Sequence, residues 1–334
     1  MERARRLAVA GAVALVLPAT ARADDTQSTL RPHSHAARDI ADLWWGLLVG
    51  SAVIVFVVTL LVVIAALRSL TRRRKAGRED STRVKSLVFA GGFAVPILVL
   101  ATLLVLTLRT LPATSAPRGH ADLTVRVIGR QWFWDVVYPG RNVTTANEIH
   151  IPVGATVKLE ARTDDVVHSF WVPQLNRKID MIPGRTNSIV LRADRAGSYR
   201  GQCAEFCGYQ HANMAFLVVA EPRAKFDTWL ARESKPAPKP AGAEQRKGLQ
   251  TFMSVGCSGC HAIAGTPADA TVGPDLTHLA GRETVAANTI PNTKGYLAGW
   301  ILDPQHVKPG NRMPGLQLTG PQLDALLAYL ETLR

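Results

Sequence analysis

The sequence predicts a multidomain membrane protein with two transmembrane helices, a β-sandwich or barrel domain and an all-α domain. Two stretches, 44–67 and 86–108, are apolar and carry no charge, a middle region has short β-rich runs, and a Pro/Ala/Lys-rich linker at 232–243 precedes a final helical region. At 334 residues, the chain has room for two soluble domains at roughly 100–200 residues each. Its net charge of +13 does not indicate a nucleic-acid partner, because the basic residues cluster beside a membrane segment.

The first 23 residues have the order of a secretory signal peptide. A basic start is followed by an apolar stretch at 7–17 and by Ala21-Arg22-Ala23, which has the form of a cleavage site. We expect cleavage after Ala23, which leaves a periplasmic N-terminal segment at 24–43. An uncleaved membrane helix is the alternative, although its apolar part is short for a span of ~20 residues.

The two apolar stretches predict a transmembrane hairpin over 44–110. Each is long enough to cross a hydrocarbon core of ~30 Å as a helix. The loop between them, 68–85, has eight Lys or Arg against two acids, so the positive-inside rule places it in the cytoplasm. We therefore expect a multi-pass protein of the bacterial inner (plasma) membrane, with the domains after the hairpin on the periplasmic side.

Residues 120–225 have the pattern of an all-β domain. Short apolar runs separated by Gly and Pro are typical of a sandwich or barrel. The predicted strands are 123–128, 148–151, 156–161, 188–191, 198–200 and 214–219.

A dense set of soft metal donors lies near the end of this domain. Cys203, Cys207, His211 and Met214 fall within twelve residues, and thiolate, imidazole and thioether groups suit copper. The two thiolates can bridge a pair of copper ions, with one His for each metal and Met214 as a weak axial ligand. A disulfide between the two cysteines is the alternative.

The copper pair needs two further ligands. His168, in His168-Ser-Phe-Trp171, is the predicted second imidazole. The main-chain carbonyl of Glu205 is the predicted axial ligand of the second ion. Two coppers that share two sulfurs can delocalise one electron, so little has to move when the charge changes.

The region 244–334 contains the attachment signature of a c-type haem. In Cys257-Ser-Gly-Cys260-His261, the two thiols add covalently to the haem and the histidine binds the iron. A zinc site is the alternative, but it would need a second pair of Cys or His at close spacing. Both cysteine pairs of the chain therefore fall in cofactor motifs, which leaves none for a structural disulfide.

Met313 is the predicted distal ligand of the iron, since Met/His ligation gives the raised potential of an electron-transferring cytochrome c. His278 and His306 are alternative axial ligands, whereas Met253 is predicted to lie in the core. A final helix with an apolar stripe at 323–330 should pack on the first helix of the domain, as in small class I cytochromes c.

Two motifs together resemble a known family. The run from Gln202 to Met214 resembles the binuclear copper (CuA) loop of subunit II of haem–copper cytochrome c oxidases. Gly129-Arg-Gln-Trp-Phe-Trp134 resembles the aromatic segment of that family. With the membrane hairpin and the tethered haem, the chain looks like subunit II of a caa3-type oxidase.

The resemblance implies a cupredoxin fold for 120–225 and a role in electron entry. Electrons would pass from cytochrome c or another periplasmic donor to the haem, then to the copper pair and then to haem a of subunit I, where oxygen is reduced. The resemblance also implies that Trp132 lies at the electron-entry surface. It further implies that the Glu205 side chain binds magnesium at the boundary with subunit I.

The chain is thus predicted to be a subunit of a proton-translocating cytochrome c oxidase whose catalytic oxygen site lies in another subunit. Two alternatives remain from the sequence. The same module could serve a nitric oxide reductase with a copper-bearing subunit. It could also be a membrane-anchored electron carrier outside any oxidase.

Overall fold

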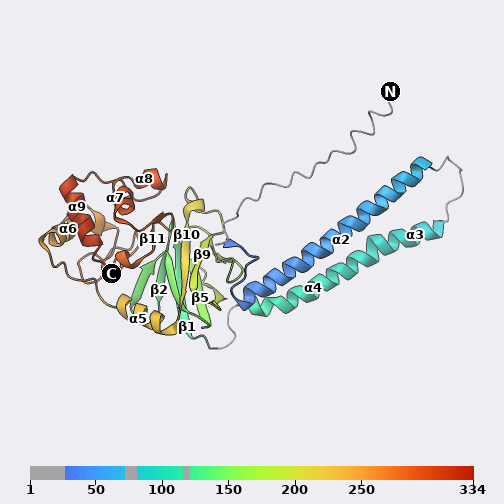
Figure 1. Cartoon of the computed structure of the whole chain (residues 1–334), viewed down its shortest axis with the longest axis horizontal. Helices are drawn as coiled ribbons and strands as arrows, with labels where there is room; N and C mark the ends of the chain where they lie inside the picture. The colour runs from blue at the N-terminus through green and yellow to red at the C-terminus, as the bar shows by residue number, and fades with distance from the viewer. Residues whose placement is uncertain (1–26, 72–80, 116–119) are drawn as a thin grey trace, which may run out of the picture.

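The computed structural model describes residues 27–71, 81–115 and 120–334. The predicted signal peptide and residues 72–80 of the predicted cytoplasmic loop lie outside the described residues. A long helical hairpin extends from a β-rich domain, and the C-terminal helices lie on the opposite side of that domain (Figure 1). The predicted multidomain fold class is confirmed.

The hairpin is formed by α2 (His35–Thr71) and by a second helical arm of α3 (Ser81–Phe89), the π-helical turn η2 (Ala90–Ala94) and α4 (Val95–Thr114). Both arms include a segment long and apolar enough to cross a membrane. The π-helical turn immediately precedes the first turn of α4, which contains Pro96; proline lacks the N–H that an inner helical position needs.

Helix α2 begins nine residues before the apolar stretch, because its start is fixed by the β-domain. Ser34 Oγ accepts a hydrogen bond from the amide of Ala37 (3.0 Å), as an N-cap does. The same hydroxyl donates to the carbonyl oxygen of Leu175 (2.5 Å). Arg38 and Asp194 form an ion pair next to this contact (2.6 Å). The first turn of the hairpin is therefore attached to the β-domain.

The β-domain is a sandwich of two five-stranded sheets, with strand orders β3-β2-β1-β5-β8 and β4-β10-β9-β6-β7. Within these sheets, β1 pairs in parallel with β5, and β4 with β10. The strands are β1 Leu123–Arg130, β2 Phe133–Tyr138, β3 Val143–Ala146, β4 Glu148–Pro152, β5 Val157–Thr163, β6 His168–Trp171, β7 Ile179–Met181, β8 Asn187–Leu191, β9 Gly197–Cys203 and β10 Ala215–Glu221.

An aromatic cluster fills the space between the sheets. Trp134 packs edge-on against Phe216 and Phe170, with ring centroids 5.0 and 6.1 Å apart, and its ring centroid lies 6.1 Å from that of His168. A Cβ atom at Gly201 would lie 2.2 Å from Phe216, so β9 can pack here only with a glycine. This cluster supports the strands that carry the metal donors.

The C-terminal domain is mainly helical and follows α5 (Arg223–Glu233). Its elements are α6 Ala243–Ser254, η4 Cys257–Gly259, η5 Leu279–Gly281, β11 Thr284–Val285, β12 Ile290–Pro291, α7 Lys294–Leu302, α8 Pro304–Val307 and α9 Gly320–Leu330. The last helix packs against α6, and a Cβ at Gly248 would lie only 2.0 Å from the carbonyl oxygen of Ala325. The two-stranded ribbon of β11 and β12 is an addition to the predicted helices.

Candidate functional site

The β-sheet brings the predicted copper donors together. His168 begins β6 and Cys203 ends β9, and these strands pair antiparallel with Phe170 opposite Cys203. The amide of Cys203 donates to the carbonyl oxygen of Met214 (2.9 Å) at the start of β10. The loop between β9 and β10 is therefore closed by sheet hydrogen bonds at its base.

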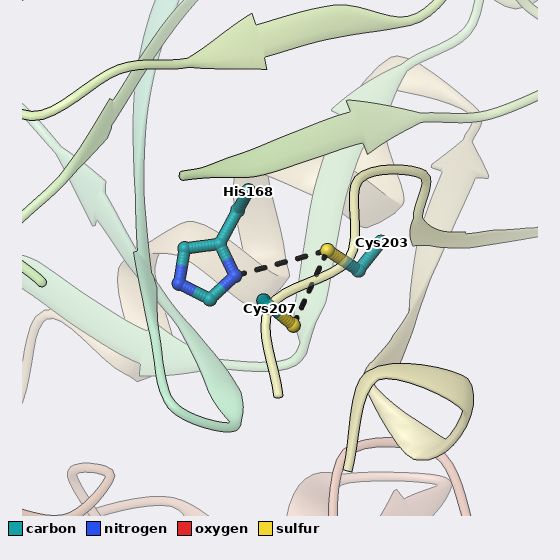
Figure 2. A group of neighbouring side chains, drawn as sticks. All are labelled: His168, Cys203 and Cys207. Carbon is teal, nitrogen blue, oxygen red and sulfur yellow. Dashed lines mark hydrogen bonds between the residues drawn. The ribbon is translucent and has the colours of Figure 1, made fainter. Parts of the chain in front are cut away.

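The donor atoms of five side chains lie next to one another. Cys203 Sγ is 3.7 Å from His168 Nδ1 and 3.7 Å from Cys207 Sγ. In turn, Cys207 Sγ is 3.7 Å from His211 Nδ1 and 3.8 Å from Met214 Sδ. Figure 2 shows the imidazole of His168 facing Cys203, with Cys207 beside it. The ligand atoms of these three residues all lie within 4.8 Å of one another.

The two sulfurs are buried free thiols in a setting that favours a thiolate. The hydrogen bond with Cys207, aided by His168, lowers the pKa of Cys203 to about 3. The same contact raises the pKa of Cys207. The carbonyl oxygen of Glu205 lies 3.2 Å from Cys203 Sγ. Two adjacent sulfurs flanked by two imidazoles, a thioether and a carbonyl fit a copper pair.

Asp165 holds the outer nitrogen of His168. Its Oδ1 lies 2.8 Å from His168 Nε2, and its Oδ2 accepts a hydrogen bond from the amide of Gln131 (2.6 Å). Burial alone would raise the pKa of Asp165, but hydrogen bonds from His168, Gln131 and Val166 outweigh burial and lower it to about 2. The carboxylate therefore stays ionised and fixes the ring with Nδ1 toward Cys203.

The side chain of Glu205 pairs with a lysine at the surface. Its carboxylate lies 3.1 Å from Lys178 Nζ, and its side chain is 44% exposed. Asp180 Oδ1 lies 3.7 Å from the same Nζ. Two carboxylates thus share one cation on the surface beside the copper loop.

A second site is a cavity of about 300 Å³, called here the haem cavity, between the C-terminal domain and the β-domain. Cys257, Cys260, His261 and Met313 all line it, as does Trp132 from the β-domain. The predicted haem ligands are therefore brought together on one cavity, and their donor set and apolar surroundings fit a covalently attached haem.

His261, the predicted proximal ligand, has a fixed ring orientation. His261 Nδ1 lies 2.8 Å from the carbonyl oxygen of Pro274, which assigns the hydrogen to Nδ1 and leaves Nε2 free. Burial lowers the pKa of His261, which favours the neutral ring. A Cβ at Gly273 would lie 2.6 Å from this ring, so the close approach needs a glycine.

The other candidate axial ligands lie elsewhere. His278 Nε2 is 3.0 Å from the carbonyl oxygen of Lys235, and His306 lies on α8; neither lines the haem cavity. Met253 packs against the apolar core of the domain.

Trp132 connects the two sites. Trp132 is one of the residues that line the haem cavity, and its Nε1 donates to the carbonyl oxygen of Cys207 (3.0 Å). The side chain of Gln131 donates to the same oxygen (2.8 Å). Because Gly208 has no side chain, the indole can lie close to the copper loop; a Cβ there would be 3.0 Å from Trp132.

Comparisons with known proteins identify two domain types in the chain. A family model described as "Cytochrome C oxidase subunit II, periplasmic domain" matches residues 139–221, and one described as "Cytochrome c" matches residues 245–334. Over 332 residues the chain is 30% identical to "Cytochrome c oxidase subunit 2" of Bacillus subtilis (strain 168), with 92% of each chain covered. The chain belongs to the cytochrome c oxidase subunit 2 family. The predicted recognition of a subunit II with a fused C-terminal cytochrome c domain is confirmed.

The chain is also similar to two further proteins, one of them a solved structure. The family member of Alkalihalophilus pseudofirmus is 39% identical over 217 residues, which cover 65% of this chain and 63% of that one. The crystal structure of the periplasmic domain of subunit II of cytochrome oxidase of Bradyrhizobium japonicum has 30% sequence identity and a TM-score of 0.34, covering 34% of this chain and 95% of that one. The two matched domain types imply copper and haem c as cofactors of this subunit.

Three residues around the sites were not predicted from the sequence. Asp165 lies three positions before His168, and that spacing was the available signal. Lys308 and Arg312 reach Trp132 from the C-terminal domain. Nothing in their local sequence marks them, because basic side chains are common on surfaces.

Proposed function

We propose that this chain is the electron-entry subunit of a cytochrome c oxidase. When bound, the cofactors would supply the redox chemistry, and single electrons would pass from cytochrome c or another periplasmic donor through haem c and a binuclear copper A centre to haem a of subunit I, where oxygen would be reduced to water. The main observation behind the proposal is the position of Trp132, which lines the haem cavity and donates a hydrogen bond to the carbonyl oxygen of Cys207.

The copper pair is assigned to the side chains of His168, Cys203, Cys207, His211 and Met214 and to the carbonyl of Glu205. The separations of 3.7 and 3.8 Å between the successive side-chain donors support this assignment. The sheet holds the donors in place, so the site can change its charge with little movement of the chain. Small rearrangement favours fast transfer of single electrons.

The haem is assigned to the second cavity. Cys257 and Cys260 would hold it covalently, and His261 and Met313 would supply the iron ligands. The hydrogen bond from His261 to Pro274 orients the ring and increases its basicity as a ligand. Trp132 is assigned as the electron-entry residue of the copper domain.

We also propose a topology for the chain. Both cofactor domains would lie on the periplasmic side of the bacterial inner membrane, anchored by a two-helix hairpin. The basic loop at 68–85 supports a cytoplasmic hairpin turn. Subunit I and further oxidase subunits would be the partners in the membrane.

Glu205 is proposed as a magnesium ligand at the boundary with subunit I. Its carboxylate and that of Asp180 already surround one cation, Lys178 Nζ. Hard divalent cations prefer carboxylate oxygens, so magnesium would take the place of the ammonium. In the assembled oxidase, Mn²⁺ substituted for magnesium should give an EPR signal that Glu205→Gln removes while the copper signal remains. A Mn²⁺ signal that survives the substitution would exclude Glu205 as the ligand.

The proposed function is tested by visible and EPR spectra of the full chain loaded with haem and copper. We expect a c-type haem band together with the multiline signal of a mixed-valence copper pair. Cys203→Ser should remove the copper signal and leave the haem band, whereas Cys257→Ser should impair covalent haem attachment and leave the copper signal. A haem band without a binuclear copper signal in the unmodified chain would refute the proposal.

A further inference from the structure

The C-terminal domain is attached to the β-domain by specific hydrogen bonds. The buried carboxylate of Glu148 accepts from the amides of Glu283 (2.7 Å) and Thr284 (3.2 Å). The amide of Ala215 donates to the carbonyl oxygen of Ala287 (3.2 Å). These contacts join residues that are more than 70 positions apart in the chain. The tethered domain therefore packs against the β-domain in a defined orientation.

Lys308 lies in this interface with only 2% of the residue exposed. Its Nζ donates to the carbonyl oxygen of Trp132 in the β-domain (3.2 Å) and to that of Ala286 in its own domain (3.2 Å). One ammonium group thus binds one carbonyl from each domain, directly beside the residue that connects the two cofactor sites.

The burial of Lys308 is costly. Burial lowers its pKa to about 7, and the nearby Cys207 offsets this only in part. Among the residues that the structure describes, no carboxylate forms an ion pair with it. Burying an ammonium group without a carboxylate costs free energy, and an apolar side chain of similar size would avoid that cost. We therefore infer that the two hydrogen bonds of Lys308 have a specific role.

The neighbouring sequence strengthens the same contact. Arg312 lies over the ring of Trp132, with its guanidinium carbon 6.0 Å from the ring centroid, and it donates to the side-chain oxygen of Gln131. Met313, the proposed distal ligand, is the next residue. The segment from Lys308 to Met313 therefore connects the haem cavity to the Gln131–Trp132 edge of the β-domain.

We propose that Lys308 is a positioning residue that holds the haem cavity against Trp132 by binding one carbonyl oxygen from each domain. This role rests on the proposed electron-entry function. In the step that it would serve, the reduced haem would give up one electron and the oxidised copper pair would accept it. No bond forms or breaks and no proton is transferred. Lys308 touches neither cofactor's ligand atoms in this role and acts through Trp132.

The test compares Lys308→Met with Lys247→Met, which removes an exposed lysine on α6. In the full chain loaded with haem and copper, a flash-activated ruthenium reductant supplies one electron to the haem, and absorbance follows its transfer to copper. Loss of the two hydrogen bonds from Lys308 should slow this intramolecular step at least about tenfold. The bimolecular reduction of the haem, the haem band and the copper EPR signal should stay unchanged, and Lys247→Met should match the unmodified chain.

Hydrogen–deuterium exchange supplies a readout that needs no electron transfer. Lys308→Met should speed exchange of the amides at 283–287 and 215, whereas Lys247→Met should not. If the Met variant does not assemble, Lys308→Gln gives the same comparison with a polar side chain.

Two results would overturn the positioning role. An unchanged intramolecular rate in the Lys308 variants, with normal transfer in the unmodified chain, would refute it alone. Absence of haem-to-copper transfer in the unmodified chain would refute the proposed function as well, and the exchange data would still report whether Lys308 holds the domains together.

Discussion

Asp165 and His168 form a carboxylate–imidazole pair in which Oδ1 lies 2.8 Å from Nε2. The opposite ring nitrogen of His168 faces Cys203 Sγ at 3.7 Å. A carboxylate on the outer nitrogen fixes the tautomer and orientation of a metal-binding histidine. The copper affinity of the site should therefore depend on Asp165, although Asp165 is not one of the proposed ligands.

Asp165→Asn should weaken copper binding, because the amide cannot hold the imidazole as a charged acceptor does. Loss of such an outer partner typically costs about 10–100-fold in metal affinity. Competition with a copper chelator measures the affinity, and EPR reports whether the pair still forms.

Asp164→Asn is the matched control for this substitution. Asp164 is exposed and pairs with Arg130 and Arg162 rather than with His168. It should leave copper affinity unchanged. Equal affinity in both variants and the unmodified chain would show that the Asp165 carboxylate is dispensable.

His150 should make the β-domain less stable as pH rises above neutrality. Burial alone would lower its pKa, but the nearby carboxylates of Glu148 (3.9 Å) and Glu221 (3.1 Å) outweigh burial and raise it above 6.5. The folded state then binds more protons than the unfolded state near pH 7. Its stabilising contribution is complete below the unfolded pKa and is lost as pH rises through the folded pKa.

Urea unfolding at several pH values between about 6 and 9 tests this dependence on the histidine. The contribution of His150 to the free energy of unfolding should fall over this range, so His150→Gln should make the change of stability with pH less negative than in the unmodified chain. The variant also loses the stacking of His150 on Trp229, so the slope with pH, rather than the stability itself, is the quantity to compare. Parallel slopes in the two proteins would contradict the assignment.

Met313→His should lower the reduction potential of the haem, because Met/His ligation raises the potential of a c-type haem. A redox titration followed by the visible spectrum measures the shift. Met253→Leu is the control, since Met253 packs in the core and does not line the haem cavity. A potential that follows Met253 and not Met313 would exclude Met313 as the ligand.

Gly248→Ala should destabilise the C-terminal domain by about 1–3 kcal/mol, the usual cost of an overpacked contact. The added Cβ would lie 2.0 Å from the carbonyl oxygen of Ala325 and 2.6 Å from Tyr329 Cβ, so α6 and α9 would have to separate. Gly295→Ala, on α7, meets no atom within 4 Å and should not destabilise the domain. Denaturant unfolding of the haem-loaded chain compares the two variants.

The strands that the sequence predicted are runs rich in apolar residues, some alternating as in β1 and β5 and one continuous as in β10. Strands β2 and β3 were not predicted, although the burial of β2 alternates along its length. Strands β1, β4, β5, β8, β9 and β10 all overlap predicted runs. Strands β6 and β7 have only four and three residues, too few for a period-2 pattern to stand out, and β6 depends on its pairing with β7 and β9. Short strands of this kind are set by tertiary contacts more than by their own sequence.

In the candidate site, too, some residues could be predicted from the local sequence and others depend on tertiary contacts. Cysteine, histidine and methionine at close spacing are rare outside cofactor sites, so the sequence alone could single out residues such as Cys203 and Met313. Asp165 and Lys308 are common residue types whose roles depend on what lies beside them after folding. Helix α2 was predicted from hydropathy, but its start at His35 depends on the contact of Ser34 with the β-domain.

The pairing of β6 with β9 also bears on the order of assembly. His168 and Cys203 lie on β6 and β9, which pair through backbone hydrogen bonds in a sheet whose core is packed by aromatic side chains. Domains such as zinc fingers, in contrast, fold only when metal binds. Here we expect the β-domain to fold first and to bind copper afterwards. Chelation should then empty the centre without unfolding the domain, and the same molecule could be filled again.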